Sequence, residues 1–281
     1  MSKVIITCDS TCDLTQAQKD EFGIITTPLY IRINDKEYKD GIDITADALF
    51  EKIRETGELP KTAAASYQDC LDMWKPLVDQ GYEIIHFSIS SSMSACFQNA
   101  RMAAEELGHV YPVDSASLSS GIALLAIEAS LMAKEGMDAK SIYEAVEKKK
   151  EKLNVSFVLD TAEYLAKGGR CSSVAAFAAG ILKLRLCIGV DGGKMDLCKK
   201  YRGKMANVLC EYVRERLNDA GDVELDRIFI TDSGTTPEIR ELVKKTVLEV
   251  KPFKRVLFSN AGCTVSSHCG PGTLGILFFN K

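Results

Sequence analysis

Short polar turns that could hold an anionic group follow three apolar segments in the first half of the chain. The turns are Asp9-Ser10-Thr11, Ser90-Ser91-Ser92-Met93-Ser94 and Asp114-Ser115. In open parallel sheets, ligands bind outside the carboxyl ends of the strands, so Ser10, Ser94 and Ser115 are candidate ligand-binding residues. The helix expected after Met93 adds free backbone amides near Ala95 and the positive end of its dipole. The alternative is that these residues only cap the following helices, but three such turns in one sheet favour a ligand crevice.

A second candidate is the segment His268-Cys269-Gly270-Pro271-Gly272 near the end of the sequence. The chain has three histidines, and His268 adjoins a stiff loop of small residues. Gly270 and Gly272 would let the backbone approach a ligand closely, and Pro271 would restrict the loop. An ordinary turn before the last strand explains this segment equally well.

A third candidate combines the end of a helix with a cation. It is the segment Lys167-Gly168-Gly169-Arg170. The Gly-Gly pair is typical of a helix C-terminus. Arg170 is a candidate for contacting an anion or an interface between lobes. A solvated side chain is the alternative.

Catalytic and metal-binding patterns are weak in this sequence. Ser94, His268 and Asp9 are the residue types of a hydrolase triad, but the G-x-S-x-G elbow is absent. No G-x-G-x-x-G follows a strand, and G-x-x-x-x-G-K-[ST] is absent. The 10 cysteines contain no C-x-x-C pair, so we expect buried apolar cysteines and no metal site. From these patterns alone we assign no catalytic residue and no cofactor. The alternative is a hydrolase or transferase that acts on an acyl or phosphate substrate with Ser94 and His268.

Composition excludes several classes of protein. Hydrophobic residues make up 46% and charged residues 26%, which is typical of a folded chain. The net charge of -4 argues against nucleic acid as a partner, because phosphate binding needs clustered cations. The start runs directly into a strand pattern without a signal peptide, and no apolar run approaches the roughly 20 residues of a membrane span. We expect a cytoplasmic protein with no transmembrane segment.

Strands and helices alternate through residues 1–150, which predicts an α/β domain with a parallel sheet covered on both faces. The expected strands are 3–8, 24–33, 83–89 and 110–113, and the expected helices are 16–22, 46–55, 68–79, 94–107, 119–134 and 140–152, with a loop at 59–62.

Residues 151–281 differ, because a hairpin at 183–201 is mixed with helices. Strands are expected at 156–159, 227–231, 255–259 and 274–279, and helices at 205–217 and 237–250. This pattern predicts a second, α+β domain, and the segment near 60–80 is expected to pack with it.

Five segments, in order along the chain, resemble motifs of the DegV family of bacterial fatty-acid-binding proteins. They are Cys8-Asp9-Ser10-Thr11-Cys12-Asp13-Leu14 (family T-D-S-T-x-D-L), Ile89 to Ala100 (L-S-S-x-L-S-G-T-Y-Q-S-A), Val113-Asp114-Ser115 (V-D-S), Thr161 to Arg170 (T-L-E-Y-L-x-K-G-G-R) and His268 to Gly272 (H-x-G-P-G). Each motif alone is moderately specific. Together they span residues 8 to 272, which makes the resemblance highly specific.

The resemblance implies two α/β domains with a lipid tunnel between or beside them, and one bound long-chain fatty acid. The family's carboxylate-binding residues fall on Thr62, Ser94 and His268, and its arginines fall on Arg170 and Arg202. In some bacteria such proteins present the fatty acid to a separate, dihydroxyacetone-kinase-like fatty acid kinase, which makes an acyl phosphate. The resemblance therefore implies a carrier whose chemistry takes place in a partner.

The chain departs from the family pattern beside these positions. Ala63-Ala64-Ala65 replaces S-Q-P after Thr62, and Ala95-Cys96 replaces Gly-Thr after Ser94. Cys8 replaces Thr or Ser, and Cys171 replaces Ile. The anion-binding residues themselves are kept, so the chain length of the ligand and the identity of the kinase are left open.

Overall fold

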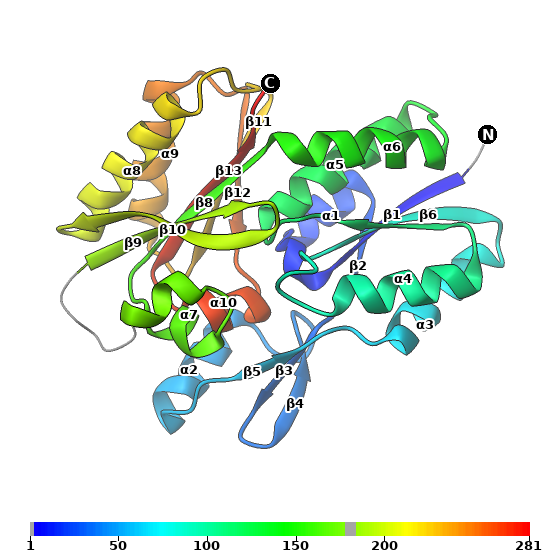
Figure 1. Ribbon diagram of the computed structural model, residues 1–281, viewed down its shortest axis with the longest axis horizontal. Helices are drawn as coiled ribbons and strands as arrows, with labels where there is room; N and C mark the ends of the chain where they lie inside the picture. The colour runs from blue at the N-terminus through cyan, green and yellow to red at the C-terminus, as the bar shows by residue number, and fades with distance from the viewer. Residues whose placement is uncertain (1–2, 178–183) are drawn as a thin grey trace.

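The first half of the chain is built on a parallel sheet with the strand order β2-β1-β6-β7 (Figure 1). The computed structural model describes residues 3–177 and 184–281. The strands of this sheet are β1 (Lys3–Asp9), β2 (Ile24–Thr27), β6 (Tyr82–Ser88) and β7 (Val110–Asp114). The register places Ile6 between Ile24 and Ile85. The predicted parallel sheet is confirmed.

Helices cover both faces of the parallel sheet. Figure 1 shows α5 (Ser120–Lys134) and α6 (Ala139–Lys149) on one face, and α3 (Tyr67–Val78) and α4 (Cys96–Leu107) on the other, while α1 (Gln16–Phe22) packs beside α5. Residues 120–127 of α5 are all buried, because this helix also contacts the sheet of the second half. A helix that is buried on every side is apolar all round.

The second half is built on a mixed sheet with the strand order β10-β9-β8-β13-β11-β12. Its strands are β8 (Leu153–Leu159), β9 (Leu184–Asp191), β10 (Lys194–Arg202), β11 (Arg227–Ser233), β12 (Arg255–Asn260) and β13 (Thr273–Phe279). Only the β11–β12 pair is parallel among the described strands of this sheet. The β9–β10 hairpin confirms the predicted turn, although its predicted first residue, Lys183, lies outside the described residues.

Two helices pack on one face of the mixed sheet. They are α8 (Met205–Asp219) and α9 (Pro237–Val250), and Tyr212 and Val243 contribute to the core between them and the strands. The other face of the sheet turns towards the parallel sheet. There, Val155, Phe157 and Leu277 share one hydrophobic cluster with residues of the first half.

A small antiparallel sheet, β4-β3-β5, was not predicted. Its strands are β3 (Tyr30–Ile33), β4 (Lys36–Lys39) and β5 (Lys61–Ala63), and α2 (Ala46–Thr56) follows β4. The predicted strand 24–33 is divided at Pro28, which has no backbone N–H to donate to a ladder. The predicted loop 59–62 is wrong for its last two residues, since Lys61 and Thr62 pair with Arg32 and Ile31.

Two short helices complete the part of the fold that matters for the site, namely α7 (Glu163–Gly168) and α10 (Cys263–Cys269). The first ends at Gly169 in the left-handed conformation, as the Gly-Gly stop predicts. The second was missed, because His268 was expected in a loop. The 3-10 segments are η1 (Ser10–Cys12), η2 (Lys150–Lys152) and η3 (Ser172–Phe177).

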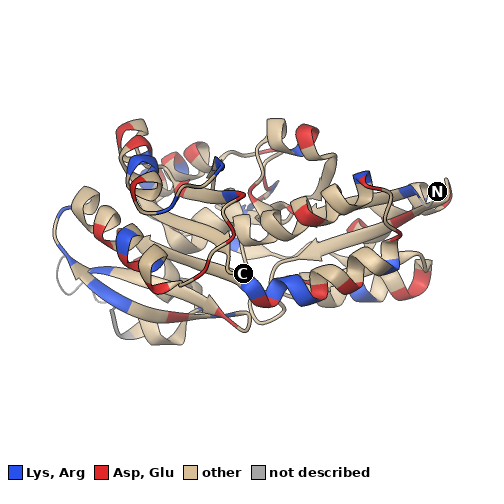
Figure 2. Cartoon of the chain, turned by 90° about the horizontal axis from the view of Figure 1, so that it is seen from above, with Lys and Arg blue, Asp and Glu red and all other residues tan. Residues whose placement is uncertain are grey.

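The surface carries charges of both signs, and Figure 2 shows basic and acidic residues interspersed along the outer helices. Within residues 3–177 and 184–281, no helix is both long enough and apolar enough to cross a membrane. All ten cysteines are free, eight of them are buried, and Cys198 is exposed. The division into domains at residue 150 stays a prediction, since one core cluster includes residues from both halves.

Candidate functional site

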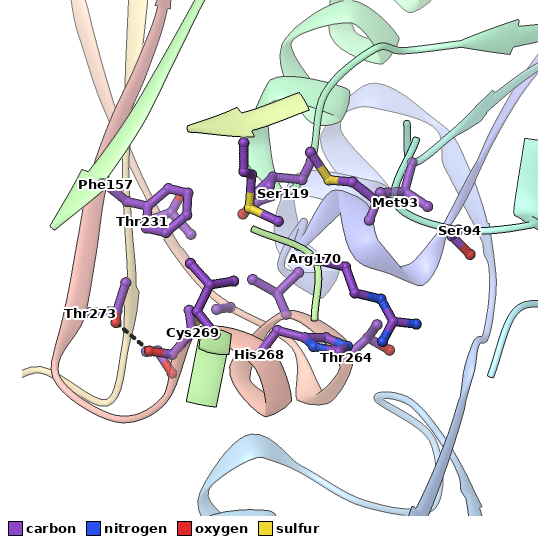
Figure 3. Close-up of a pocket in the computed structure, with 18 of the residues that line it drawn as sticks. Met93, Ser94, Ser119, Phe157, Arg170, Thr231, Thr264, His268, Cys269 and Thr273 are labelled. Carbon is purple, nitrogen blue, oxygen red and sulfur yellow. Dashed lines mark hydrogen bonds between the residues drawn. The ribbon is translucent and has the colours of Figure 1, made fainter. Parts of the chain in front are cut away.

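A cavity of about 270 Å³ lies between one face of the mixed sheet and the loops at the carboxyl ends of the parallel strands (Figure 3). Both halves of the chain contribute to its wall. Ile89, Met93 and Leu118 come from the loops after β6 and β7, while Val155, Phe157 and Leu277 come from β8 and β13. Its lining is mostly apolar, as expected for a site that takes a hydrophobic ligand.

One end of the cavity, which we call the head end, is formed by Thr62, Ser94, Arg170 and His268. These residues come from β5, the loop before α4, the turn after α7, and α10. They are up to 206 positions apart along the chain. The structure therefore brings together the four side chains that the sequence singled out from separate motifs.

The imidazole of His268 is held in its neutral form. Its Nε2 lies 2.9 Å from Thr62 Oγ1, with which it shares a hydrogen bond. Burial, and then the positive charge of Arg170, lower the pKa of His268 to about 4. Its other nitrogen, Nδ1, is buried and has no hydrogen-bond partner among the described residues. An unpaired buried polar atom is costly unless a ligand or water contacts it.

Close approaches at three glycines bring the segment 160–168, which includes α7, against α10 and the turn that follows it. A methyl group at Gly168 would overlap His268 Nδ1, so the end of α7 lies against the ring. A methyl group at Gly270 would lie 2.6 Å from the Tyr164 ring, and one at Gly272 would lie 3.0 Å from Asp160 Cβ. Gly270 and Gly272 thus approach the α7 segment, and the structure places both outside the cavity lining. The sequence predicted that these two glycines let the backbone approach a ligand closely. In the structure, the close approach is made to protein atoms.

Ser94 and Ala95 line the head end at the start of α4. Ser94 Oγ accepts a hydrogen bond from the backbone of Cys96 at 3.3 Å and lies 3.1 Å from its sulfur. Burial raises the pKa of the Cys96 thiol to about 12, so this thiol stays protonated. Ala95, the N-cap residue, makes no side-chain cap, so of the first amides of α4 the one at Cys96 is taken by Ser94 and the next ones have no side-chain acceptor at the N-cap.

Arg170 is exposed although it lines the cavity. One of its guanidinium nitrogens, Nη1, donates to the carbonyl of Gly168 at 2.6 Å. Figure 3 shows its guanidinium beside the ring of His268, at the end of the cavity where Ser94 lies. A positive charge here favours an anionic ligand group.

Three predicted residues lie away from this cavity. Ser10 donates to Asp40 at 3.1 Å, and Ser115 is buried in a local turn, where its hydroxyl accepts from the backbone of Ser117 at 3.2 Å. Arg202 is exposed at the end of β10. Ser10 and Ser115 therefore bond to protein groups away from the cavity, and neither is the N-cap of the following helix, which is Asp9 for η1 and Ser119 for α5.

Two buried carboxylates that the sequence did not single out hold the beginning of α10. Asp40 accepts hydrogen bonds from the backbone of Cys263 at 2.8 Å and from the hydroxyl of Thr264 at 2.6 Å. Asp13 accepts from the backbone of Gly262 at 2.8 Å. The N-terminus of the helix that carries His268 is thus fixed by the first half of the chain. More than 220 positions separate Asp40 from Cys263, so no local pattern signals this contact.

The remaining hydroxyl groups of the cavity wall are occupied by protein partners. Their hydrogen bonds are Ser119 to Asp13, Ser156 to Tyr212, Thr231 to Ser120, Ser233 to Ser266, Thr264 to Asp40 and Thr273 to the carbonyl of Cys269. A hydroxyl bonded within the protein presents mainly its carbon atoms to a ligand. Away from the head end, this wall behaves as an apolar surface.

Neither a catalytic triad nor a metal centre is assembled among the described residues. Ser94 bonds to Cys96 and His268 bonds to Thr62, and no hydrogen bond joins Ser94 to His268. A nucleophilic serine requires a base within hydrogen-bonding reach. Within residues 3–177 and 184–281, no group of three or more His, Cys, Asp or Glu side chains is arranged to hold a metal ion.

Comparison with known proteins gives consistent matches along the whole chain. A model of the DegV family matches residues 3–281. A DegV domain-containing protein of Clostridium perfringens is 31% identical, over 99% of this chain and 98% of that protein. A fatty acid-binding protein of Thermotoga maritima is 26% identical, over 97% of this chain and 96% of that protein. The solved structure of a DegV family protein from Thermus thermophilus, described by its fatty acid binding, is 25% identical with a TM-score of 0.89, covering 99% of this chain and 100% of that chain.

Proposed function

Because the chain belongs to the DegV family, we propose that it binds a single long-chain fatty acid in the cavity between its two halves. The relatives described as fatty-acid-binding, from Thermotoga maritima and Thermus thermophilus, support this function. The observation that carries the proposal is the distribution of polar groups along the cavity. At the head end, the buried Nδ1 of His268 has no hydrogen-bond partner among the described residues and the cationic side chain of Arg170 is exposed, whereas the hydroxyls elsewhere on the wall bond to protein groups.

The apolar wall suits the acyl chain. Moving one CH₂ group out of water gains about 0.8 kcal/mol, so a chain of about 16 carbons gains on the order of 10 kcal/mol before ordering costs are subtracted. Met93, Phe157 and Leu277 supply apolar surface for this contact. The carbon atoms of the occupied serines and threonines supply more.

The head end suits the carboxylate, which must remain hydrogen-bonded when it is buried. The proposed donors are the hydroxyl of Ser94, the amides of α4 that follow Cys96, and the Thr62–His268 pair. Because this pair shares one hydrogen bond, either the Thr62 hydroxyl or the imidazole donates to the carboxylate, and not both. A neutral imidazole carries one proton, which it shares with Thr62 or donates through Nδ1. The charge of Arg170 then compensates the carboxylate.

The bound fatty acid is proposed to be presented to a separate fatty acid kinase, so that this chain acts as a carrier. Exposure of Arg170 and Ala95, which both line the head end, supports access to the carboxylate from outside. Phosphoryl transfer to that carboxylate builds up negative charge, which Arg170 is positioned to offset. Arg202 lies outside the cavity lining, so its proposed role is contact with the partner.

Native mass spectrometry of the purified protein, followed by extraction of bound lipid, tests the proposal directly. We expect one fatty acid per chain, or uptake of one equivalent when oleic acid is added to delipidated protein. A protein that is empty after purification and takes up no added fatty acid contradicts the proposed function.

A further inference from the structure

The hydroxyl of Ser94 at the head end is held by one neighbouring residue, Cys96. The backbone amide of Cys96 donates to Ser94 Oγ at 3.3 Å, and the sulfur of Cys96 lies 3.1 Å from the same oxygen. Cys96 is the first residue of α4, is buried, and does not line the cavity. Figure 3 shows Ser94 at the end of the cavity where the Arg170 guanidinium lies. The state of a ligand-facing hydroxyl is therefore set by a residue that lies behind it.

The sulfur of Cys96 carries a proton that it can donate. Burial, and then the negative charge of Asp9, raise the pKa of this thiol to about 12. The carboxylate of Asp9 lies near the same sulfur and is a second acceptor within reach. Its Oδ1 already accepts from the hydroxyl of Thr11, and its Oδ2 accepts from the backbone of Ile89. Ser94 Oγ, which has no such partners, is therefore the favoured acceptor of the thiol proton.

These two contacts decide what the Ser94 hydroxyl can offer to a ligand. A serine hydroxyl has two lone pairs and one proton. When the amide and the thiol of Cys96 both donate to the oxygen, the lone pairs are taken and only the proton is left. A carboxylate accepts hydrogen bonds and has no proton to donate, so it matches this group. The hydroxyl of a fatty alcohol also needs an acceptor for its own proton, which Ser94 would not provide.

We propose that Cys96 is a positioning residue that makes the Ser94 hydroxyl a hydrogen-bond donor only, so that the head end selects an ionised carboxylate over a neutral headgroup. This inference rests on the proposed fatty acid binding. It predicts that a residue at position 96 must be able to donate to Ser94 Oγ from its side chain. Threonine and valine separate this requirement from shape, because they differ mainly in the hydroxyl that only threonine can donate.

Displacement of cis-parinaric acid, a fluorescent fatty acid, by oleic acid and by oleyl alcohol tests the selection. Cys96→Val should weaken oleic acid binding about three- to fivefold and oleyl alcohol binding by less than about twofold. Cys96→Thr should keep the wild-type ratio of the two affinities, and Cys96→Ala, which removes the donor without adding a branch, should behave as Cys96→Val does. Cys187→Val is the control, at a buried cysteine of the other core that does not line the cavity, and should bind both ligands as the wild type does.

A double-mutant cycle shows whether Cys96 acts through Ser94. In a Ser94→Ala background, threonine and valine at position 96 should give equal affinities for oleic acid, because the group they act through is gone. A difference that persists in this background overturns the proposal. Unchanged or raised oleic acid affinity in the Cys96→Val variant also overturns it, and a raised affinity would show that Ser94 donates to the sulfur. If the wild type binds no fatty acid, the proposed function fails together with this inference, whereas wild-type binding that Cys96→Val leaves unchanged contradicts only the inference.

Discussion

The two regions that join the halves of this molecule around the cavity differ in how firmly they are held. At α10, buried Asp13 and Asp40 accept backbone and hydroxyl hydrogen bonds across the junction. At the hairpin tip, one neutral hydrogen bond and the close fit of Gly193 make the contact. Hydrogen bonds to charged groups contribute about 1.5–3 kcal/mol each, and neutral ones about 0.5–1.5 kcal/mol. The α10 junction is therefore a fixed frame for the headgroup, whereas the hairpin tip makes a weaker contact with the first half and is held mainly by the ladder of β9 with β8.

Removal of the carboxylate at Asp40 should have the largest effect. Asp40→Ala leaves the first amides of α10 and the hydroxyl of Thr264 unpaired in a buried place. We expect the free energy of unfolding to fall by about 2–4 kcal/mol in chemical denaturation. Asp72→Ala, at an exposed carboxylate that accepts one hydrogen bond within α3, should change it by less than about 0.5 kcal/mol. Similar losses in both variants would show that the α10 junction is not held by the buried carboxylate.

The pH dependence of the free energy of unfolding should include a contribution from His268, the buried histidine of α10. The unfolded chain takes up a proton on His268 near its ordinary pKa of 6.5, but the folded chain does so only near 4. The contribution of neutral His268 to the free energy of unfolding is therefore fully present above about pH 6.5. It is lost as the pH falls towards 4.

The measurement is the free energy of unfolding at pH 7 and pH 5. The wild type should lose about 1–2 kcal/mol more over this interval than His268→Gln. His109→Gln changes an exposed histidine and should keep the wild-type dependence. An identical pH dependence in the His268→Gln variant and the wild type would show that His268 titrates in the folded protein as it does in the unfolded chain.

Because α7 packs closely against the imidazole ring of His268, a methyl group added to α7 tests whether the position of this ring matters for fatty acid binding. Gly168→Ala places a methyl group on His268 Nδ1 and should turn the ring away from Thr62, lowering fatty acid affinity about tenfold, or about 1.4 kcal/mol. Gly169→Ala is the control, since no atom lies within 4 Å of its methyl group. Its left-handed φ of +69° should lower stability but leave affinity unchanged. Titration calorimetry with oleic acid measures both variants.

The smallest expected effect concerns one hydrogen bond to the carboxylate. Ser94→Ala should weaken fatty acid binding about three- to tenfold, the effect of losing one hydroxyl donor to a charged group. Ser92→Ala, an exposed serine of the same loop that does not line the cavity, should bind as the wild type does. Unchanged affinity in the Ser94→Ala variant would contradict the proposed headgroup contacts.

Sequence patterns predicted the helices and turns whose boundaries are set by residues close together in the sequence. The helix Gln16–Phe22 has a capping box between Thr15 and Gln18 and ends at Gly23, so all of its boundary signals lie between Thr15 and Gly23. The hairpin turn at Asp191-Gly192-Gly193 and the helix stop at Gly168-Gly169 are local in the same way. Such signals act through backbone conformation and can be read without knowledge of the fold.

The tertiary structure alone decided which polar residues meet. Ser94 and Ser115 follow similar strands, yet only Ser94 lines the cavity. Lys61–Ala63 becomes a strand because Tyr30–Arg32 lies beside it, and α10 depends on carboxylates from the other half of the chain. Contacts of this kind depend on where the chain returns in space, which residue type and local spacing do not specify. The sequence by itself thus determined the local elements and the residue types of the head end, and folding decided which of them share one cavity, because a hydrogen bond forms only between groups that the whole fold brings together.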